Sequence, residues 1–374
     1  MILIFLIITI CYSTLIGSFI LGFNKITTFK LKNTSAKTKF SILIPFRDEA
    51  LHLPFLLKSI KHLNYPKQLF EIIFIDDASH DNSVEIIKST LNSLNIQSNI
   101  ITNIRTTNSP KKDALTLAIK IAKYDWIITT DADCQLPKLW LNSFDAYIQE
   151  NNTVCIAAPV TFNTTKTFLN RFQILDMLSL QGATIGGFGI NKPFLCNGAN
   201  FGYKKSIFMD LNGFKGNSNI ASGDDIFLLE KVIKKYPNQL HYLKSKSAIV
   251  TTLTQPTWKL LISQRIRWAA KTSTYNNWFG QFTGLIVLLI NALIIIELTL
   301  IFINALNFKS LLYTALVKFS IDFYLLHKSA SFFNQKNVLK SYLLGFIIYP
   351  FFSVYVACIS TFSGYKWKGR FFKK

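Results

Sequence analysis

The sequence of 374 residues has few cysteines, few histidines and few acids for its length. Its five cysteines include no C-x-x-C pair, and its five histidines show no spacing typical of metal ligands. We therefore expect neither a zinc site nor a disulfide framework, and we treat the histidines as structural or surface residues. Few cysteines and no pairing pattern suit a reduced, cytosolic setting for the polar part of the chain.

The sequence has 20 Asp and Glu residues and 41 Lys and Arg residues, which gives a formal charge of +21. Such a charge suits a nucleic acid, an anionic ligand or the cytoplasmic face of a bilayer. No basic helix with interleaved aromatic residues suggests groove reading or base stacking. We therefore expect an anionic ligand and membrane lipids as partners, and no nucleic acid.

Residues 1–23 contain no charged side chain and are long enough for a membrane-spanning helix. A cleaved signal peptide is the alternative, but it would carry basic residues before a shorter apolar run. Here the basic residues follow the run, so the positive-inside rule places the N-terminus outside and the next segment in the cytoplasm. These residues are Lys25, Lys30, Lys32, Lys37 and Lys39.

Residues 39 to about 158 alternate short apolar runs with amphipathic stretches of helix length. This pattern predicts βα units on a mainly parallel, Rossmann-like sheet buried on both faces, which is an α/β fold. The predicted strands read FSILIP, FEIIFID, NIITNI, DWIITTD and VCIAAP, with helices around 50–63, 81–94, 111–123 and 137–149. Ligands bind outside the carboxyl ends of such strands, so polar residues there are candidates for the site.

The most informative of these strand ends is Asp131-Ala132-Asp133, which follows the buried run from Trp126 to Thr129. In an extended chain, residues i and i+2 share a face, so both carboxylates can point at one hard cation. An Asx turn at the strand end is the alternative. Asp76-Asp77 also has a structural and a functional interpretation. One of the two acids can cap the next helix, and the second, Asp77, can accept hydrogen bonds from a nucleoside.

Two further clusters lie at predicted helix starts. In Ser222-Gly223-Asp224-Asp225, one acid can cap the helix, and a carboxylate beside a bound donor can act as a general base. In Lys111-Lys112-Asp113, the lysines can reach a phosphate or simply start a solvated basic helix. Between residues 159 and 255 the pattern loosens, and the glycines of 182–187 and 197–202 predict either substrate-wrapping backbone or ordinary turns.

Residues 256–273 predict a helix with Trp258, Ile262, Ile266 and Ala269 on one face. The stretch Gln264-Arg265-Ile266-Arg267-Trp268 combines guanidiniums, which suit diphosphates, with an indole on which a sugar can stack. Taken by itself, the stretch is better explained by an interfacial helix with snorkelling arginines and a belt tryptophan.

After residue 279 the sequence turns strongly apolar, and we expect a membrane region over 279–363 and a basic tail over 364–374. Lys318 and Asp322 interrupt the middle apolar segment and can pair along one helix. Three crossings would leave the basic tail outside, against the positive-inside rule. Either one segment does not fully cross, or residues 279–308 fold back as two short helices.

Together these motifs resemble the inverting nucleotide-sugar glycosyltransferases of family 2, in the membrane-integrated branch that includes cellulose, chitin and hyaluronan synthases. The resemblance runs from about Phe40 to Lys271, with an echo at Trp367-Lys368-Gly369-Arg370. It implies a GT-A domain over residues 39–253 and an interfacial helix over 254–278 that carries a Q-x-x-R-W motif.

The resemblance also implies a role for each motif. Pro45 and Glu49 would belong to the nucleotide-binding turn, and Asp77 would contact the base. Asp131 and Asp133 would hold the donor diphosphate through Mg²⁺ or Mn²⁺, and Asp225 would be the catalytic base. The remaining residues expected at the donor, diphosphate or acceptor are Lys112, Asp224, Gln264, Arg267 and Trp268.

The implied reaction moves a sugar from a nucleotide-diphospho-sugar to a lipid-linked or polysaccharide acceptor, with inversion. The expected location is the cell membrane, in a multi-pass protein whose catalytic domain is cytoplasmic. A processive polysaccharide synthase of the cellulose or hyaluronan type and an inactive membrane scaffold are the alternatives. The scaffold is disfavoured because every acid that the reaction needs is present.

Overall fold

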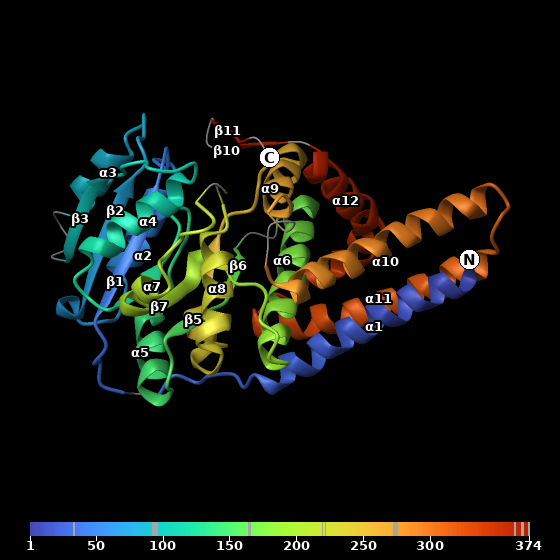
Figure 1. Cartoon of the computed structure of the whole chain (residues 1–374), viewed down its shortest axis with the longest axis horizontal. Coiled ribbons are helices and arrows are strands. Elements are labelled where there is room, and N and C mark those ends of the chain that lie inside the picture. The colour runs from blue at the N-terminus through green and yellow to red at the C-terminus, as the bar shows by residue number, and fades with distance from the viewer. Residues whose placement is uncertain are drawn as a thin grey trace. The chain divides into compact units, whose positions relative to one another are not determined.

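The chain is described by a computed structural model that covers residues 1–32, 34–91, 96–163, 166–218, 220, 222–271, 276–362, 364–367 and 370–372. These residues form two compact units, each assembled from separate stretches of the chain (Figure 1). The α/β unit contains residues 27–163 and 195–253. The helical unit contains residues 1–26, 164–194 and 254–374.

The first half of the α/β unit alternates strands and helices as the apolar pattern predicts. The elements are β1 (Phe40–Phe46), α2 (Leu53–Lys61), β2 (Phe70–Asp76), α3 (Ser83–Leu91), β3 (Gln97–Thr102), α4 (Pro110–Ile121), β4 (Trp126–Thr129), α5 (Trp140–Glu150) and β5 (Cys155–Ala157). Each predicted strand and helix is therefore present within a few residues, and the predicted α/β class is confirmed.

The main sheet has the strand order β3-β2-β1-β4-β7-β5-β8, where β7 spans Phe201–Lys204 and β8 spans Leu240–Tyr242. Strands β1 to β4 are parallel, whereas β7 runs antiparallel to β4 and β5. The order of the parallel strands reverses between β1 and β4, and a crevice forms outside the carboxyl ends at such a switch point. The turns after β1 and β4 therefore meet there.

The remaining elements of the α/β unit are short. They are β6 (Val160–Phe162), which pairs with β9 (Val250–Thr252) in a second sheet, the helices α7 (Lys205–Asp210) and α8 (Asp224–Lys235), and the single 3₁₀ turns η1 (Lys67–Leu69), η2 (Gly198–Asn200), η3 (Pro237–Gln239) and η4 (Lys246–Ala248).

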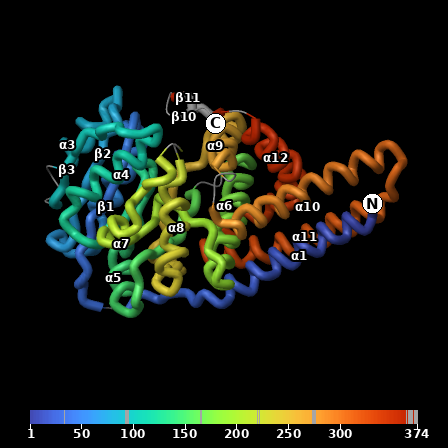
Figure 2. The backbone as a smooth tube through the Cα atoms, in the orientation of Figure 1, coloured from blue at the N-terminus to red at the C-terminus, as the bar shows by residue number. Residues whose placement is uncertain are grey.

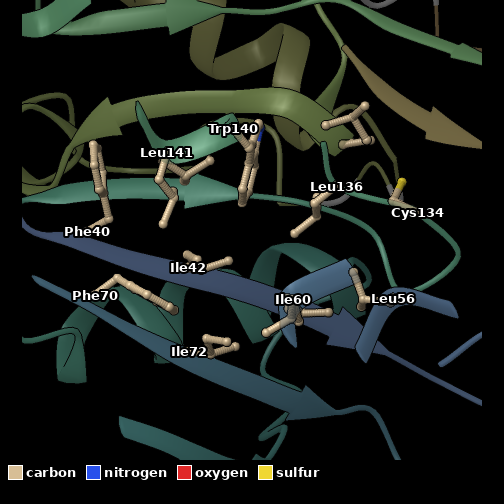
Figure 3. Packing of buried hydrophobic residues seen from close by; sticks show 14 of the residues in the cluster. Phe40, Ile42, Leu56, Ile60, Phe70, Ile72, Cys134, Leu136, Trp140 and Leu141 are labelled. Atoms are coloured by element: carbon tan, nitrogen blue, oxygen red, sulfur yellow. The ribbon is translucent and has the colours of Figure 1, made fainter. Parts of the chain in front are cut away.

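Apolar side chains on β1 and β2 form a core with helices of the same unit. Figure 3 shows Ile42 and Ile72, which are register partners, in one cluster with Ile60 of α2 and Trp140 of α5. The indole Nε1 of Trp140 donates to Oδ1 of the fully buried Asn200, at 2.9 Å. Pairing a buried polar group avoids a desolvation penalty, so this bond holds α5 to the start of β7 without weakening the core.

The helical unit contains α1 (Ile2–Lys25), α6 (Phe168–Gly189), α9 (Trp258–Ala269), α10 (Trp278–Phe302), α11 (Phe308–Phe332), η6 (Lys336–Ser341) and α12 (Tyr342–Phe362), followed by the paired strands β10 (Tyr365–Trp367) and β11 (Arg370–Phe372). Three of its segments are long and apolar enough to cross a membrane, namely α1, α10 and residues 336–362. Helix α10 is continuous over 25 residues, so the prediction of two short helices over residues 279–308 is wrong. Gly369 and the lysines 368, 373 and 374 of the predicted tail and echo lie outside the described residues, as do residues 272–275.

Helix α6 replaces the turns or substrate-wrapping backbone that the glycines of 182–187 predicted. Thr167 and Asn170 form a capping box at its start, a helix signal that outweighs the glycines. Gly186 and Gly189 serve close packing against α1, because a Cβ on Gly186 would lie 2.5 Å from the carbonyl oxygen of Phe19 and one on Gly189 would overlap that of Gly22. Figure 2 shows the C-terminal ends of α1 and α6 meeting at this crossing.

Two ion pairs with a buried cation lie in the helical unit, one within a helix and one between two helices. Lys318 and Asp322 lie 2.6 Å apart on α11, as their spacing predicts, and the hydroxyl of Tyr12 on α1 donates to Asp322. Arg265 of α9 pairs with Asp176 of α6, also at 2.6 Å. Because burying an unpaired charge costs several kcal/mol, such pairing fixes which helices pack together.

Candidate active site

The turns that follow β1 and β2 are tied together by hydrogen bonds. Arg47 donates from Nη1 to the carbonyl oxygens of Asp77 and Ala78, each at 2.6 Å. The amide of His80 donates to Oδ1 of Asp48, at 2.7 Å. Both Asp48 and Ala78 have left-handed backbones, with φ of 50° and 57°. The nucleotide-binding turn expected around Glu49 is therefore held against the strand end that carries Asp77.

The two adjacent acids after β2 have different surroundings. Oδ1 of Asp76 accepts from the amide of Ser79, at 2.9 Å, and closes the turn. Asp77 is buried and accepts at Oδ1 from Nε of Arg105, at 2.6 Å, and from Nδ2 of Asn103, at 2.8 Å. Asp76 thus has the local structural role, whereas the side chain of Asp77 is oriented by two residues that follow β3. Its contact with a nucleoside base stays a prediction.

The acids after β4 lie in a turn and not on an extended strand. The amide of Cys134 donates to the carbonyl oxygen of Asp131, at 3.1 Å, so Ala132 and Asp133 occupy the centre of a tight turn. The expectation that both carboxylates share a strand face is wrong, because β4 ends at Thr129. The turn still brings them together, since burial, then the charge of Asp131, then that of Glu49 raise the pKa of Asp133 to about 6.

Glu49 and His52 lie on the β1 side of the crevice. Nδ1 of His52 lies 2.6 Å from Oε2 of Glu49, and the histidine acts against the neighbouring acids to lower the pKa of Asp133. His52 was expected to be structural or on the surface, and its position beside the acids was missed. The available signal was its spacing of three residues from Glu49 at the start of α2. Pro45, the predicted neighbour, is partly exposed near the end of β1.

The two lysines at the start of α4 point to different partners. Nζ of Lys111 lies 2.8 Å from Oδ1 of Asp131 and 3.4 Å from Oδ2 of Asp224. Burial alone would lower the pKa of Lys111, but these carboxylates raise it. Lys112, the residue expected at the donor, donates instead to the carbonyl oxygens of Asn217 and Ile220.

The acids before α8 join the same cluster. Gly223, with φ of 84°, precedes the helix, and Asp224 and Asp225 occupy its first turn. Asp225 accepts two backbone hydrogen bonds. Its Oδ2 accepts from the amide of Gly198, at 2.9 Å, and its Oδ1 accepts from the amide of Ile226, at 2.8 Å. A Cβ on Gly198 would lie 3.1 Å from Oδ2 of Asp224, which explains a glycine at this close approach. Motifs from four parts of the sequence thus converge, around residues 111, 131, 198 and 224.

Part of this cluster lies in a stretch of the chain that matches a known family. Residues 41–211, which include β1, the acids after β4 and Gly198, match the model of the family described as "Glycosyl transferase family 2". The chain contains a family 2 glycosyltransferase domain. The predicted resemblance is therefore confirmed at the level of the domain.

Curated relatives of the family 2 domain are glycosyltransferases. A probable glycosyltransferase of Bacillus subtilis, YdaM, is 27% identical over 258 residues, which cover 66% of this chain and 60% of YdaM. The undecaprenyl-phosphate 4-deoxy-4-formamido-L-arabinose transferase of Proteus mirabilis is 36% identical over 101 residues, which cover 26% of this chain and 30% of that protein. The chain thus spans less than two thirds of the length of these relatives.

A solved structure shares the fold over most of the chain. The mannosyltransferase PcManGT from Pyrobaculum calidifontis, solved with GDP-Man and Mn²⁺, matches 91% of this chain and 98% of its own, with a TM-score of 0.56 and 14% sequence identity. At this identity the similarity shows the fold alone.

The acids of the family 2 domain suit a divalent cation whose coordination is completed by a ligand. No group of three or more His, Cys, Asp or Glu side chains is placed to hold a metal within the part of the chain that the structure describes. Mg²⁺ commonly uses one or two carboxylates together with substrate phosphates. The mutual crowding of Asp131, Asp133 and Glu49 is what a cation would relieve, so the residues fit such an ion.

The Q-x-x-R-W motif lies on α9, in the helical unit. Leu261 and Arg265 are the buried residues of this helix, whereas Trp258, on the predicted apolar face, is 37% exposed. Arg265 can be buried because Asp176 neutralises its charge. The guanidinium of Arg265 bonds Oε1 of Gln264 and stacks 4.1 Å from the ring centroid of Trp268.

Arg265 thereby orients two of the three predicted motif residues. Arg267 and Trp268 are partly exposed. The expected contacts of Gln264, Arg267 and Trp268 with diphosphate or acceptor stay predictions.

Proposed function

We propose that the protein transfers a sugar from a nucleotide-diphospho-sugar to a lipid-linked or polysaccharide acceptor at the membrane, with inversion at the anomeric carbon. The observation that carries the proposal is the cluster of Lys111, Asp131 and Asp224 at the carboxyl end of β4, with Asp225 beside it. In this cluster, one of the two acids proposed to bind a cation lies close to the carboxylates of a helix start.

The donor occupies the crevice between the turns after β1 and β4. Asp77 binds the nucleoside, and the neighbouring Asn103 and Arg105 fix its carboxylate. Asp131 and Asp133 hold a divalent cation, which supplies charge neutralisation for the leaving diphosphate. Lys111 exchanges its contact with Asp131 for a diphosphate oxygen, since an ammonium suits a phosphate as a point charge.

Asp225 accepts the proton of the acceptor hydroxyl. Two backbone N–H groups hold its carboxylate in one orientation, and each oxygen has a second lone pair to accept the hydroxyl. The hydroxyl oxygen attacks the anomeric carbon, the bond to the diphosphate breaks, and the nucleoside diphosphate leaves. Arg267 and Trp268 serve the diphosphate and the acceptor.

The family 2 domain works on the cytoplasmic side of a multi-pass membrane protein. Support comes from the lysines that follow α1, the only cluster of charge adjoining that span, and from the positive-inside rule. Because α11 is not among the segments suited to cross, two crossings after the domain would return the basic tail to the cytoplasm, in agreement with that rule. The name of the Proteus relative, an undecaprenyl-phosphate transferase, supports a lipid-linked acceptor.

The test uses the detergent-solubilised full chain with a panel of nucleotide sugars and Mg²⁺ or Mn²⁺. We expect Asp225→Asn to bind donor as the parent does, by calorimetry, and to lose transfer by on the order of 10²–10⁴-fold. Asp210→Asn is the matched control, because Asp210 is a surface acid paired with Lys235, and it should leave turnover unchanged. Unchanged turnover in Asp225→Asn would remove the assignment of the base.

Product length separates single transfer from processive synthesis. One labelled sugar on the acceptor is expected for a lipid-linked transferase, whereas a ladder or polymer would establish a synthase. Absence of turnover with every donor, in protein that still binds nucleotide, would favour the scaffold.

A further inference from the structure

Lys112 is a buried cation whose task differs from that of its neighbour. Successive residues of a helix point about 100° apart, so Lys111 and Lys112 cannot face the same partner. Lys112 is 2% exposed, and its Nζ donates to the carbonyl oxygens of Asn217, at 2.7 Å, and Ile220, at 2.8 Å. Both carbonyls belong to the segment that leads into α8 and its acids.

The ammonium of Lys112 also contacts α8 itself. Its Nζ lies 4.6 Å from the ring centroid of Phe227, and Phe227 follows Asp225 by two residues. One side chain of α4 thus holds both the backbone before α8 and an aromatic ring in the first turns of that helix. Asp225 lies between these two attachment points in the sequence.

A second lysine holds the earlier half of the same segment. Nζ of Lys231, on the far part of α8, donates to the carbonyl oxygens of Leu211, Gly213 and Lys215, at 3.2, 2.6 and 2.8 Å. The segment turns sharply, with positive φ at Asn212, Gly213, Gly216 and Gly223. The described residues of this segment form turns, and the two lysine ammonium groups give further donors to the carbonyls there.

We infer that Lys112 is a positioning residue for the base Asp225, and that it fixes the entry into α8 through the Asn217 and Ile220 carbonyls. This inference rests on the proposed function, because it takes Asp225 as the base. Lys231 stabilises the same segment at its start, away from the acids. Lys111 is the lysine that meets the donor.

The test compares three lysine-to-methionine variants in the full solubilised chain. Lys112→Met should lower kcat by on the order of 100-fold, since small displacements of a catalytic group have effects of that size, and should leave the donor KM within about threefold. Lys112→Arg should recover most of kcat, because a guanidinium can also donate to two carbonyls. Lys231→Met should reduce the thermal unfolding temperature and keep kcat within about threefold.

Lys111→Met provides the opposite signature, a raised donor KM. A raised donor KM in Lys112→Met, with kcat unchanged, would overturn the inference and make Lys112 a donor ligand. An equal loss of kcat in Lys231→Met would also overturn it, because the effect would then be general to the segment.

Amide exchange gives a readout that is independent of turnover and works if Lys112→Met folds poorly. We expect faster hydrogen exchange at the amides of Ile226 and Phe227 in Lys112→Arg than in the parent, and still faster exchange in Lys112→Met, with α2 unaffected. Unchanged exchange in both variants would overturn the inference. If Asp225→Asn keeps full turnover while the exchange pattern appears as expected, then the assignment of the base has failed and the positioning of the helix start by Lys112 stands.

Discussion

Two charged sites, one in each unit, contrast in the sign of the charges that lie closest together. In the helical unit, Lys318 lies 2.6 Å from Asp322 and Arg265 lies 2.6 Å from Asp176, so each buried cation has a carboxylate partner within the same unit. In the α/β unit, Asp131 and Glu49 crowd Asp133 and raise its pKa to about 6. Opposite charges in contact stabilise a fold, whereas like charges in contact destabilise it and attract a cation. The first arrangement stabilises the packed helices, and the second is the one to which our proposed function gives cation binding.

Breaking one pair of the helical unit should have the largest effect. Lys318→Met leaves the partly buried Asp322 with its Tyr12 hydrogen bond but without its cation, and we expect a loss of about 3 kcal/mol in the free energy of unfolding. The measurement is unfolding in detergent micelles. The double variant Lys318→Met/Asp322→Leu is the control and should recover most of the loss. If the single variant is as stable as the parent, the pair has no assembly role.

Removing one acid of the cluster should have the reverse consequence for stability. Asp133→Asn should lower turnover by on the order of 10²–10³-fold, because a cation ligand is lost. At pH 7 its thermal unfolding temperature should not fall, since the raised pKa means that ionised Asp133 is disfavoured in the folded state. A drop in unfolding temperature comparable to that of Lys318→Met would contradict the contrast between the units.

The pH dependence of cation binding follows from the same pKa. Asp133 must lose its proton to bind the ion, so Mn²⁺-dependent nucleotide binding should weaken by about tenfold for each pH unit below about 6. Without metal, the folded state holds this proton more tightly than the unfolded chain, so stability should decrease as pH rises from about 4 to about 6. Calorimetry between pH 5 and 7.5 measures the binding. A nucleotide affinity that does not change across this range would contradict the prediction.

His52 should tune that midpoint, and this is the smallest expected effect. His52 lowers the pKa of Asp133, so His52→Gln should move the midpoint of Mn²⁺ binding upward by less than about one pH unit. His62→Gln is a suitable control, because His62 is exposed at the end of α2 and bonds only its own helix backbone in the part of the chain that the structure describes. A downward shift in His52→Gln would exclude the electrostatic role.

Much of the fold could be predicted from the sequence because apolar runs and helix-length stretches alternate so regularly up to residue 158. The strands are apolar because the sheet is buried. In β4, for example, all four residues from Trp126 to Thr129 are buried. Helix α6 was missed because glycine signals a turn when its surroundings are unknown. Only the approach of α1 reveals that Gly186 serves packing.

The sequence predicted which acidic residues lie at the candidate site, but it was less informative about which basic residues lie there. Acid spacing identified Asp131, Asp133 and Asp225, although the turn at Asp131 could not be foreseen from spacing alone. The choice between Lys111 and Lys112 depends on how α4 is rotated about its axis, and adjacent residues of equal chemistry carry no information on that rotation. Arg105 escaped notice because its partner Asp77 lies in a different βα unit.

The close packing of α1 on Gly186 and Gly189 of α6 bears on the order in which the helices come together while the chain is being synthesised. Tyr12 of α1 and its partner Asp322 of α11 are 310 residues apart in the chain, so α1 leaves the ribosome long before that hydrogen bond can form. Helix α6 is made much earlier than α11, and its contact through Gly186 and Gly189 needs only backbone atoms that are already in place. Because chains tend to fold from the N-terminus as they are made, we expect α1 to pack on α6 before it packs on α11.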